Sequence, residues 1–441
     1  MFTRRALITL LIPLFIEQSL AMTIGIADTI MVSSVGEAAV SSVSLVDNIN
    51  LLLSNIFTAL ASGGAVIVAQ YIGRGDRENA NTAAKQLIYA SIILTIFITV
   101  VSISFNQQIL RLIFGKIDAD VMTNAEIYYY ITAASYPFLA LYNAGAALFR
   151  VMRNTKVSMF TSIIMNIISI SGNAITIFIF KMGVTGAALT TLLARIVGAV
   201  IILILITNKS NIVFVEKIFK PQINFNMIKK ILNIGIPNGL ENGMFQIGKL
   251  LVAGIITIFG TSAIAANAVS NTVSGIVVLP GSAIGIAMIT VIGQCVGAGD
   301  YDQAIFNTKR LMKMIYIFTG FFNLPVLLFT PQLVSLFQLS DIATKTAIEV
   351  IRIYAVANFL IWPLSFSLPT ALRASGDARF TMATSITSMW LFRIGFSYLF
   401  AVVMDLGLHG VWFGMYVDWI FRSTVFIIRF VRGKWKKVRV I

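Results

Sequence analysis

Apolar runs of about 20 residues recur along the whole chain, and they restrict its fold more than any other feature. A helix of about 20 apolar residues crosses the roughly 30 Å hydrocarbon core of a bilayer. Charged residues make up only 12% of the chain and hydrophobic residues 58%, whereas a soluble domain carries about 25% charged residues. A membrane β-barrel would show segments of about 10 residues with alternating polarity, which this sequence lacks. We therefore predict an all-α polytopic membrane protein.

The spacing of the apolar runs predicts twelve transmembrane helices. We place them near residues 7–32, 46–72, 84–106, 127–149, 158–180, 185–207, 231–259, 264–296, 311–330, 346–371, 381–404 and 408–430. One longer polar, lysine-bearing stretch separates two sets of six. The predicted organisation is an N-terminal six-helix bundle (1–208), a cytoplasmic linker (209–230), a C-terminal six-helix bundle (231–430) and a basic cytoplasmic tail (431–441).

The basic residues predict the orientation of the chain. Most of the 33 Lys and Arg residues fall in alternate loops and in the C-terminal tail. Because cytoplasmic loops are enriched in Lys and Arg, we expect both termini in the cytoplasm and the chain in the cell (inner) membrane. The net charge of +15 then reflects topology and attraction to anionic membrane lipids, and no nucleic-acid partner is expected. A single Cys and a single His argue against a His/Cys metal site and an intramembrane enzyme.

An internal repeat divides the chain into two similar halves. Glu17 and Glu241 each lie four residues after a proline, inside an apolar run, and they are 224 residues apart. The same offset, or one residue less, relates the Gln-x2-Gly-x-Gly-Asp loops at 70–76 and 294–300, the Gly-x2-Gly pairs at 183–186 and 407–410, and Arg150 and Arg373. Since six spans is an even number, the halves are parallel repeats. We expect two six-helix repeats around a central cleft, with alternating access by rocking of the bundles.

Several motifs carry a resemblance to a known family. They are Asp28-Thr-Ile-Met-Val32 followed by Gly36, the twin Gln-x2-Gly-x-Gly-Asp loops, Ala-Leu-Arg-Ala-Ser-Gly-Asp at 371–377, and Gly-Val-Thr-Gly-Ala-Ala at 183–188. Over essentially the whole chain they resemble the multidrug and toxic compound extrusion (MATE) family. The resemblance implies a secondary active antiporter that exports organic cations, drugs and other amphipathic compounds in exchange for protons or sodium ions. No cofactor besides the coupling ion is implied, and we expect a monomer.

The first span carries two carboxylates that can face one cavity. Asp28 matches the family's first-span aspartate, which takes part in cation or proton binding. Glu17 lies eleven residues earlier, so the two are about 20° apart around the helix and about 16 Å apart along it. An acid inside the bilayer is costly and indicates a functional site by default. The alternative is that each acid pairs with a buried base such as Arg195.

One position departs from the family. Asn173 stands where many prokaryotic members have a fifth-span aspartate, so its amide oxygen can bind a hard cation such as sodium but cannot titrate. Ser169, one turn earlier, and Thr191 in the sixth span can add oxygens. We therefore predict an ion-coupling site of Asp28, Glu17, Asn173, Ser169 and Thr191, in which Asp28 and Asn173 would hold sodium if the transporter is sodium-coupled. The alternative for the neutral residues is interhelical hydrogen bonding.

The C-terminal half does not repeat this chemistry. Val252 stands where the repeat would place a second first-span aspartate, and Lys249 adds a base to the seventh span. We predict that Glu241 and Lys249 take part in substrate binding, with Lys249 or a cationic substrate as the partner of Glu241. Tyr142 and Trp362 suit contacts with flat hydrophobic cations, the alternative being core packing.

The last span contains Asp418 and Arg422 at i, i+4 spacing, which predicts a structural ion pair. Arg393 in the eleventh span can join it. The nearest rival function is a lipid or lipid-linked oligosaccharide flippase of the same architecture, for which Lys249 and Arg195 are the available intramembrane cations. A channel is a further alternative.

Overall fold

The computed structural model of the protein describes residues 2–115, 117–216 and 222–441, without the side chain of Ile26. Every regular element within these residues is helical. Contacts group the chain into two compact units, Thr3–Gly239 and Leu240–Val440. The boundary falls inside helix α9 (Phe225–Thr257). Residues 217–221 of the predicted linker lie outside the described residues, and α9 begins within the stretch assigned to that linker.

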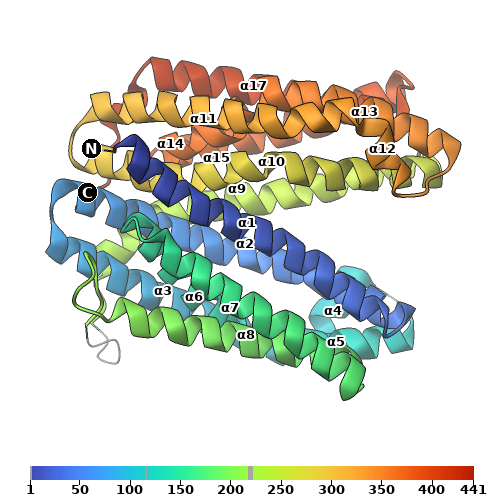
Figure 1. The fold of residues 1–441 in the computed structure, drawn as a ribbon, viewed down its shortest axis with the longest axis horizontal. Helices are drawn as coiled ribbons and strands as arrows, with labels where there is room; N and C mark the ends of the chain where they lie inside the picture. Colours follow the sequence, from blue (N-terminus) through green and yellow to red (C-terminus); the bar gives the residue numbers. More distant parts are fainter. Residues whose placement is uncertain (1, 116, 217–221) are drawn as a thin grey trace. The chain divides into compact units, whose positions relative to one another are not determined.

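The first unit is a bundle of long helices. Its elements are α1 (Arg4–Ser33), α2 (Glu37–Arg74), α3 (Arg77–Ser104), α4 (Asn106–Phe114), α5 (Ala119–Ala134), α6 (Tyr136–Val151), α7 (Thr155–Asn173), the π-helical segment η1 (Ala174–Ile179), α8 (Gly183–Ile206) and the start of α9. Helix α7 lies between α1 and α8, and α2 packs on α3, α5 and α6 (Figure 1). This arrangement brings α1, which carries Asp28, against α7, which carries Asn173.

The second unit contains the rest of α9 and more interrupted helices. They are α10 (Gly260–Gly297), α11 (Tyr301–Leu328), α12 (Thr330–Ser335), α13 (Asp341–Leu360), η2 (Pro363–Ser367), α14 (Leu368–Ala374), α15 (Ala378–Thr387), η3 (Ser388–Ile394), α16 (Gly395–Tyr398), η4 (Leu399–Val403), α17 (Gly407–Val431) and η5 (Lys434–Lys437). Helix α10 packs on α11, α13 and α14, and α17 packs on η3, α16 and η4. Segments η2, η3 and η4 are π-helical, a form that is often found at functional sites.

The structure confirms a multi-pass helical membrane protein. Within the described residues, nine helices are long and apolar enough to cross a membrane, and α13 with η2–α14, bent by 55°, makes ten. The other two predicted spans are also helical. One is divided into α5 and α6 at Ser135. The other, α9, carries polar residues such as Glu241 and Lys249 among its apolar ones.

The repeated glycine loops form the same turn in each unit. Gly75 and Gly299 have φ values of 79° and 75°, a left-handed conformation that glycine adopts without steric cost. The aspartate that follows caps the next helix, because Asp76 Oδ1 accepts from Asn79 N at 3.1 Å and Asp300 Oδ1 accepts from Gln303 N at 2.9 Å. An aspartate cap of this kind satisfies an otherwise unpaired helix N–H group. Both repeated loops are therefore tight turns that lead directly into a capped helix.

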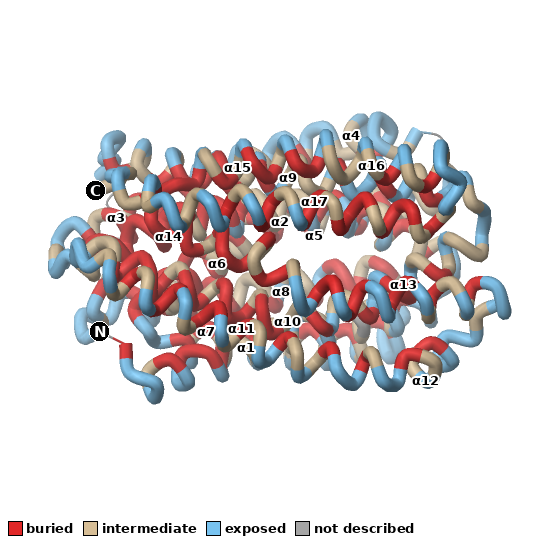
Figure 2. The backbone as a smooth tube through the Cα atoms, turned by 90° about the horizontal axis from the view of Figure 1, so that it is seen from above, coloured by how far each residue is buried: buried red, intermediate tan, exposed pale blue. Residues whose placement is uncertain are grey.

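Burial follows the pattern of membrane helix bundles. Buried residues alternate with exposed ones along most helices (Figure 2). Many exposed side chains are large and apolar, for example Phe97 (67% exposed) on α3 and Phe321 (72% exposed) on α11. Such surfaces are compatible with lipid, since lipid tails are as apolar as the side chains themselves.

Candidate functional site

Glu17 is held in a buried ion pair inside the first unit. Its side chain on α1 is ion-paired with Arg150 at the end of α6. Ser158 Oγ donates to Glu17 Oε2 at 3.0 Å and Tyr142 OH donates to Oε1 at 3.4 Å. Glu17 is only 4% exposed. Both carboxylate oxygens are therefore satisfied by protein groups.

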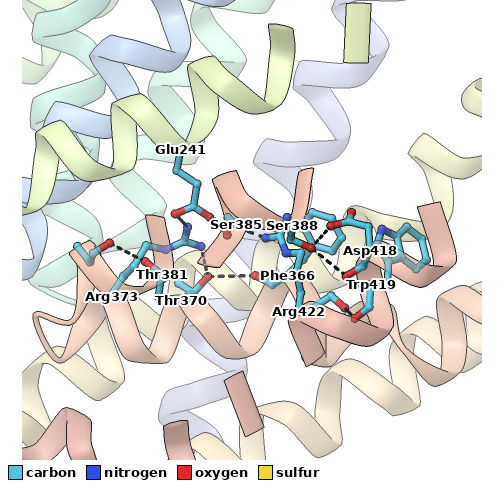
Figure 3. A network of polar contacts seen from close by, with 12 residues as sticks. Glu241, Phe366, Thr370, Arg373, Thr381, Ser385, Ser388, Asp418, Trp419 and Arg422 are labelled. Carbon is cyan, nitrogen blue, oxygen red and sulfur yellow. Dashed lines mark hydrogen bonds and ion pairs between the residues drawn. The ribbon is translucent and has the colours of Figure 1, made fainter. Parts of the chain in front are cut away.

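Glu241 has an equivalent environment in the second unit. Arg373 Nη1 lies 3.1 Å from Glu241 Oε2, and Ser385 Oγ donates to Oε1 at 2.7 Å. Arg422 Nη2 approaches Oε1 at 3.8 Å. Figure 3 shows Glu241 pointing from α9 toward Arg373, which in turn contacts Thr370. The partner of Glu241 is thus Arg373 and not Lys249.

The two units therefore repeat a whole contact between three residues, a glutamate, an arginine and a serine. In each unit a glutamate from the first helix of the repeat pairs with the arginine that ends the fourth predicted span, and a serine from the fifth span donates to it. Sequence reasoning did not pair Glu17 with Arg150, or Glu241 with Arg373. The signal was present, because the acids and the arginines recur at nearly the same offset.

The structure brings Asp28 and Asn173 together. Asn173 Nδ2 donates to Asp28 Oδ1 at 2.8 Å. Asn173 is 1% exposed and its Oδ1 has no hydrogen-bond partner, so a rotated amide would present an unpaired oxygen beside the carboxylate. Ser169 is buried one turn earlier on α7, and Thr191 Oγ1 donates to Ala187 O on its own helix. Within the described residues, neither of these two is hydrogen-bonded to Asp28.

Sequence reasoning missed a second carboxylate near this site. Asp47 on α2 accepts hydrogen bonds from Asn50 Nδ2 at 3.2 Å and Tyr128 OH at 3.3 Å. Arg195 on α8 acts electrostatically on both Asp28 and Asp47, while its Nη1 donates to Ser135 Oγ at 2.6 Å. Asp47 lies at the edge of a predicted span, where a carboxylate is unremarkable in sequence. The folded structure, and not the local sequence, shows that the charge of Asp47 acts on Asp28.

The predicted pair of Asp418 and Arg422 is replaced by other contacts. Asp418 accepts from Ser388 and lies 3.7 Å from Arg393 Nη1. The guanidinium of Arg422 instead lies over the Phe366 ring at 4.4 Å and reaches toward Glu241. Asp418 and Arg422 still interact electrostatically, but no direct ion pair joins them within the described residues. Neighbouring helices offer Arg422 a ring and an acid, and they offer Asp418 the Arg393 guanidinium. The suggestion that Arg393 joins Asp418 is confirmed.

The remaining predicted residues fall in different environments. Tyr142 is buried against Glu17 in the first unit. Trp362 and Lys249 line a cavity of about 390 Å³ in the second unit. No group of three or more His, Cys, Asp or Glu side chains suited to a metal ion occurs among residues 2–115, 117–216 and 222–441.

Comparisons with known proteins identify similar chains and folds. The model of the MatE family matches residues 13–175 and 237–399, and these two stretches are again 224 residues apart. The chain is 29% identical to the uncharacterized transporter YisQ of Bacillus subtilis (strain 168), over 94% of this chain and 91% of that one. It is 26% identical to a probable multidrug resistance protein NorM of Thermotoga maritima, over 99% of this chain and 94% of that one. A solved outward-facing multidrug resistance MATE family transporter of the MOP superfamily has the same fold, with a TM-score of 0.91 at 22% identity, over 98% of this chain and 96% of that chain.

Proposed function

Because the chain belongs to the MatE family, whose members are membrane transporters and not enzymes, we propose that it is a secondary active antiporter of amphipathic, drug-like molecules. Organic cations are among the expected substrates, and protons or sodium ions are the coupling ions. The relatives described as probable multidrug resistance proteins support drug-like substrates. We further propose a monomer in the cell (inner) membrane, in contact with membrane lipids and with both termini in the cytoplasm.

The hydrogen bond between Asp28 and Asn173 carries this proposal. Glu17, Glu241 and Asp418 each face an arginine within ion-pairing distance. Asp28 has no ion pair within the described residues, and the hydrogen bond to its carboxylate comes from a neutral amide. A half-buried carboxylate without a fixed counter-ion can exchange one bound cation for another. We therefore propose Asp28 as the coupling group, with Asn173 as an oxygen ligand when the ion is sodium.

The coupling step follows from charge neutralisation. A proton or sodium ion arriving from outside neutralises Asp28 and weakens its hold on a cationic substrate, which leaves. The neutral site then favours the inward-facing state, where the ion departs and new substrate binds. A charge moving inward gains about 2.3 kcal/mol per 100 mV, which suffices for modest accumulation by alternating access.

Proteoliposomes test this proposal. They are loaded with a fluorescent organic cation, and a sodium or proton gradient is imposed. The wild-type protein should accelerate dye exchange only when the gradient of the coupling ion is imposed. Asp28→Asn should reduce this acceleration at least tenfold. The matched control is Asp302→Asn, at an exposed carboxylate in the first turn of α11, which should behave as wild type. Equal gradient-driven exchange by Asp28→Asn and wild type would exclude Asp28 as the coupling group.

A further inference from the structure

The second unit contains a cavity whose charge is opposite to that expected for a cation site. It has a volume of about 390 Å³ and is lined by residues of α9, α10, α13, η2, η3 and α17. This volume is in the range of small-molecule pockets. All of its lining residues belong to this one unit.

Two cations and no carboxylate line this cavity within the described residues. Lys249 is exposed to it and has neither an ion pair nor a hydrogen bond in the described part of the chain. The second cation is Arg393, whose nearest carboxylate, on Asp418, is 3.7 Å away, and whose Nε has no acceptor. A cationic ligand would add a third positive charge here, and like charges disfavour one another in a medium of low dielectric constant.

The neutral lining suits the body of an amphipathic ligand. Six aromatic rings line the cavity: Phe245, Tyr354, Trp362, Phe366, Trp412 and Trp419. Lys249 and Arg393 each lie 5.4 Å from the centre of the Phe245 ring, so the protein's own cations already occupy this cation–π contact. Trp419 is 3% exposed, and its indole N–H has no acceptor. The walls therefore combine apolar rings with the exposed Lys249 ammonium group, whereas the unpaired Nε of Arg393 and the indole N–H of Trp419 are buried behind the cavity surface.

We propose that this cavity binds an amphipathic organic anion, with a flat or apolar body against the rings and a sulfonate, carboxylate or phosphate group near Lys249 and Arg393. Such a group would supply the counter-charge and the acceptor that Lys249 lacks. The proposal rests on the transporter function and adds anions to its substrate range. The site in the first unit has the opposite polarity, since Asp28 and Asp47 are both acted on by Arg195 and, within the described residues, by no other base.

Equilibrium binding to the full-length protein in a non-ionic detergent tests this assignment without any ion gradient. The probes are naphthalene-2-sulfonate and its cationic counterpart naphthalen-2-ylmethylammonium, measured by calorimetry. The sulfonate should bind at least about tenfold tighter than the ammonium compound, which corresponds to about 1.4 kcal/mol. Lys249→Gln should weaken sulfonate binding about tenfold, and Lys249→Arg should retain it. Lys313→Gln removes an exposed lysine of α11 that does not line the cavity and should bind as wild type.

The source of the natural anion is resolved by competition. Displacement of the sulfonate by oleoyl lysophosphatidate, but not by the zwitterionic lysophosphatidylcholine, would indicate a lipid headgroup, as a flippase would require. Failure of both lipids to displace it would indicate a soluble anion. Tighter binding of the ammonium probe, or sulfonate binding that Lys249→Gln leaves unchanged, would overturn the assignment. Because binding is measured without transport, a lack of gradient-driven exchange would refute the antiporter proposal and leave this one standing.

Discussion

The buried pair of Glu17 and Arg150 gives a quantitative test of how the first unit is held together. Substituting Arg150→Met leaves Glu17 charged, 4% exposed and supported only by the Ser158 and Tyr142 hydroxyls. Removing one partner of a buried pair costs about 3–5 kcal/mol. We expect about 3 kcal/mol, because the two hydroxyls remain and the Arg150 side chain is 19% exposed.

The double variant separates the ion pair from the packing. In Glu17→Met/Arg150→Met no charge is left unpaired, and methionine fills a similar volume, so the pair is replaced by apolar contacts. The lost hydrogen bonds to two hydroxyls cost about 1 kcal/mol each. Ser158 retains its bond to Thr155 O. The double variant should therefore lose about 2 kcal/mol. The single Glu17→Met variant leaves Arg150 without its carboxylate and should also cost about 3 kcal/mol, so the coupling energy between the two residues is about 4 kcal/mol.

Unfolding by SDS in mixed micelles measures these free energies. Lys156→Met is the control, since Lys156 is exposed in the first turn of α7 and a surface change should stay within about 0.5 kcal/mol. A coupling energy below about 1 kcal/mol, or a single Arg150→Met variant as stable as wild type, would refute the buried pair. Glu17 would then be available as a coupling group in the resting protein.

Two further perturbations test packing and the candidate site. Gly414→Ala should destabilise the protein by about 1–3 kcal/mol, because an added Cβ would lie 2.4 Å from Ser397 N. Gly395 has open space where its Cβ would lie, so Gly395→Ala should be neutral or stabilising by about 0.5–1 kcal/mol. Equal stability of these two glycine variants in SDS unfolding would contradict the close contact. Asn173→Ala removes the amide donor of Asp28 and should cost about 1–2 kcal/mol in the same assay, and wild-type stability of this variant would show that the hydrogen bond contributes nothing.

The sequence predicted the helices and the repeat because both depend on local patterns. Long apolar runs are visible without knowledge of any contact, and all twelve predicted stretches are helical in the structure. The twin loops were predictable for a similar reason, since a glycine that needs a left-handed conformation and an aspartate that caps a helix are adjacent in sequence. One predicted span is divided at Ser135, two residues before Pro137, and another bends by 55° at Pro363. Proline disrupts a continuing helix, so both breaks have a local signal that the apolar runs alone do not contain.

Most ion pairs were not predicted, because their partners are distant in sequence and local spacing does not join them. Glu17 and Arg150 are 133 residues apart, and in the sequence only the shared repeat offset links the acids with the arginines. The i, i+4 rule for Asp418 and Arg422 considers one helix only, and it failed where neighbouring helices offered better partners. Asp28 and Asn173 are hydrogen-bonded in the structure, and the family resemblance linked these two positions because it supplies long-range information that spacing alone lacks.

The balance of the duplicated charges indicates where the two halves differ in chemistry. Each unit contains a glutamate neutralised by an arginine in the same structural context, so these pairs leave no net charge and can serve as matching structural elements. The charges outside them are unlike. In the first unit the two carboxylates of Asp28 and Asp47 outnumber the one nearby base, Arg195, whereas in the second unit Lys249 and Arg393 outnumber Asp418.

If the two sites act independently, neutralising Asp28 should change ion coupling without changing anion affinity, and neutralising Lys249 should change anion affinity without changing ion coupling. Cross-effects of equal size in both variants would mean that the ion and the anion share one site.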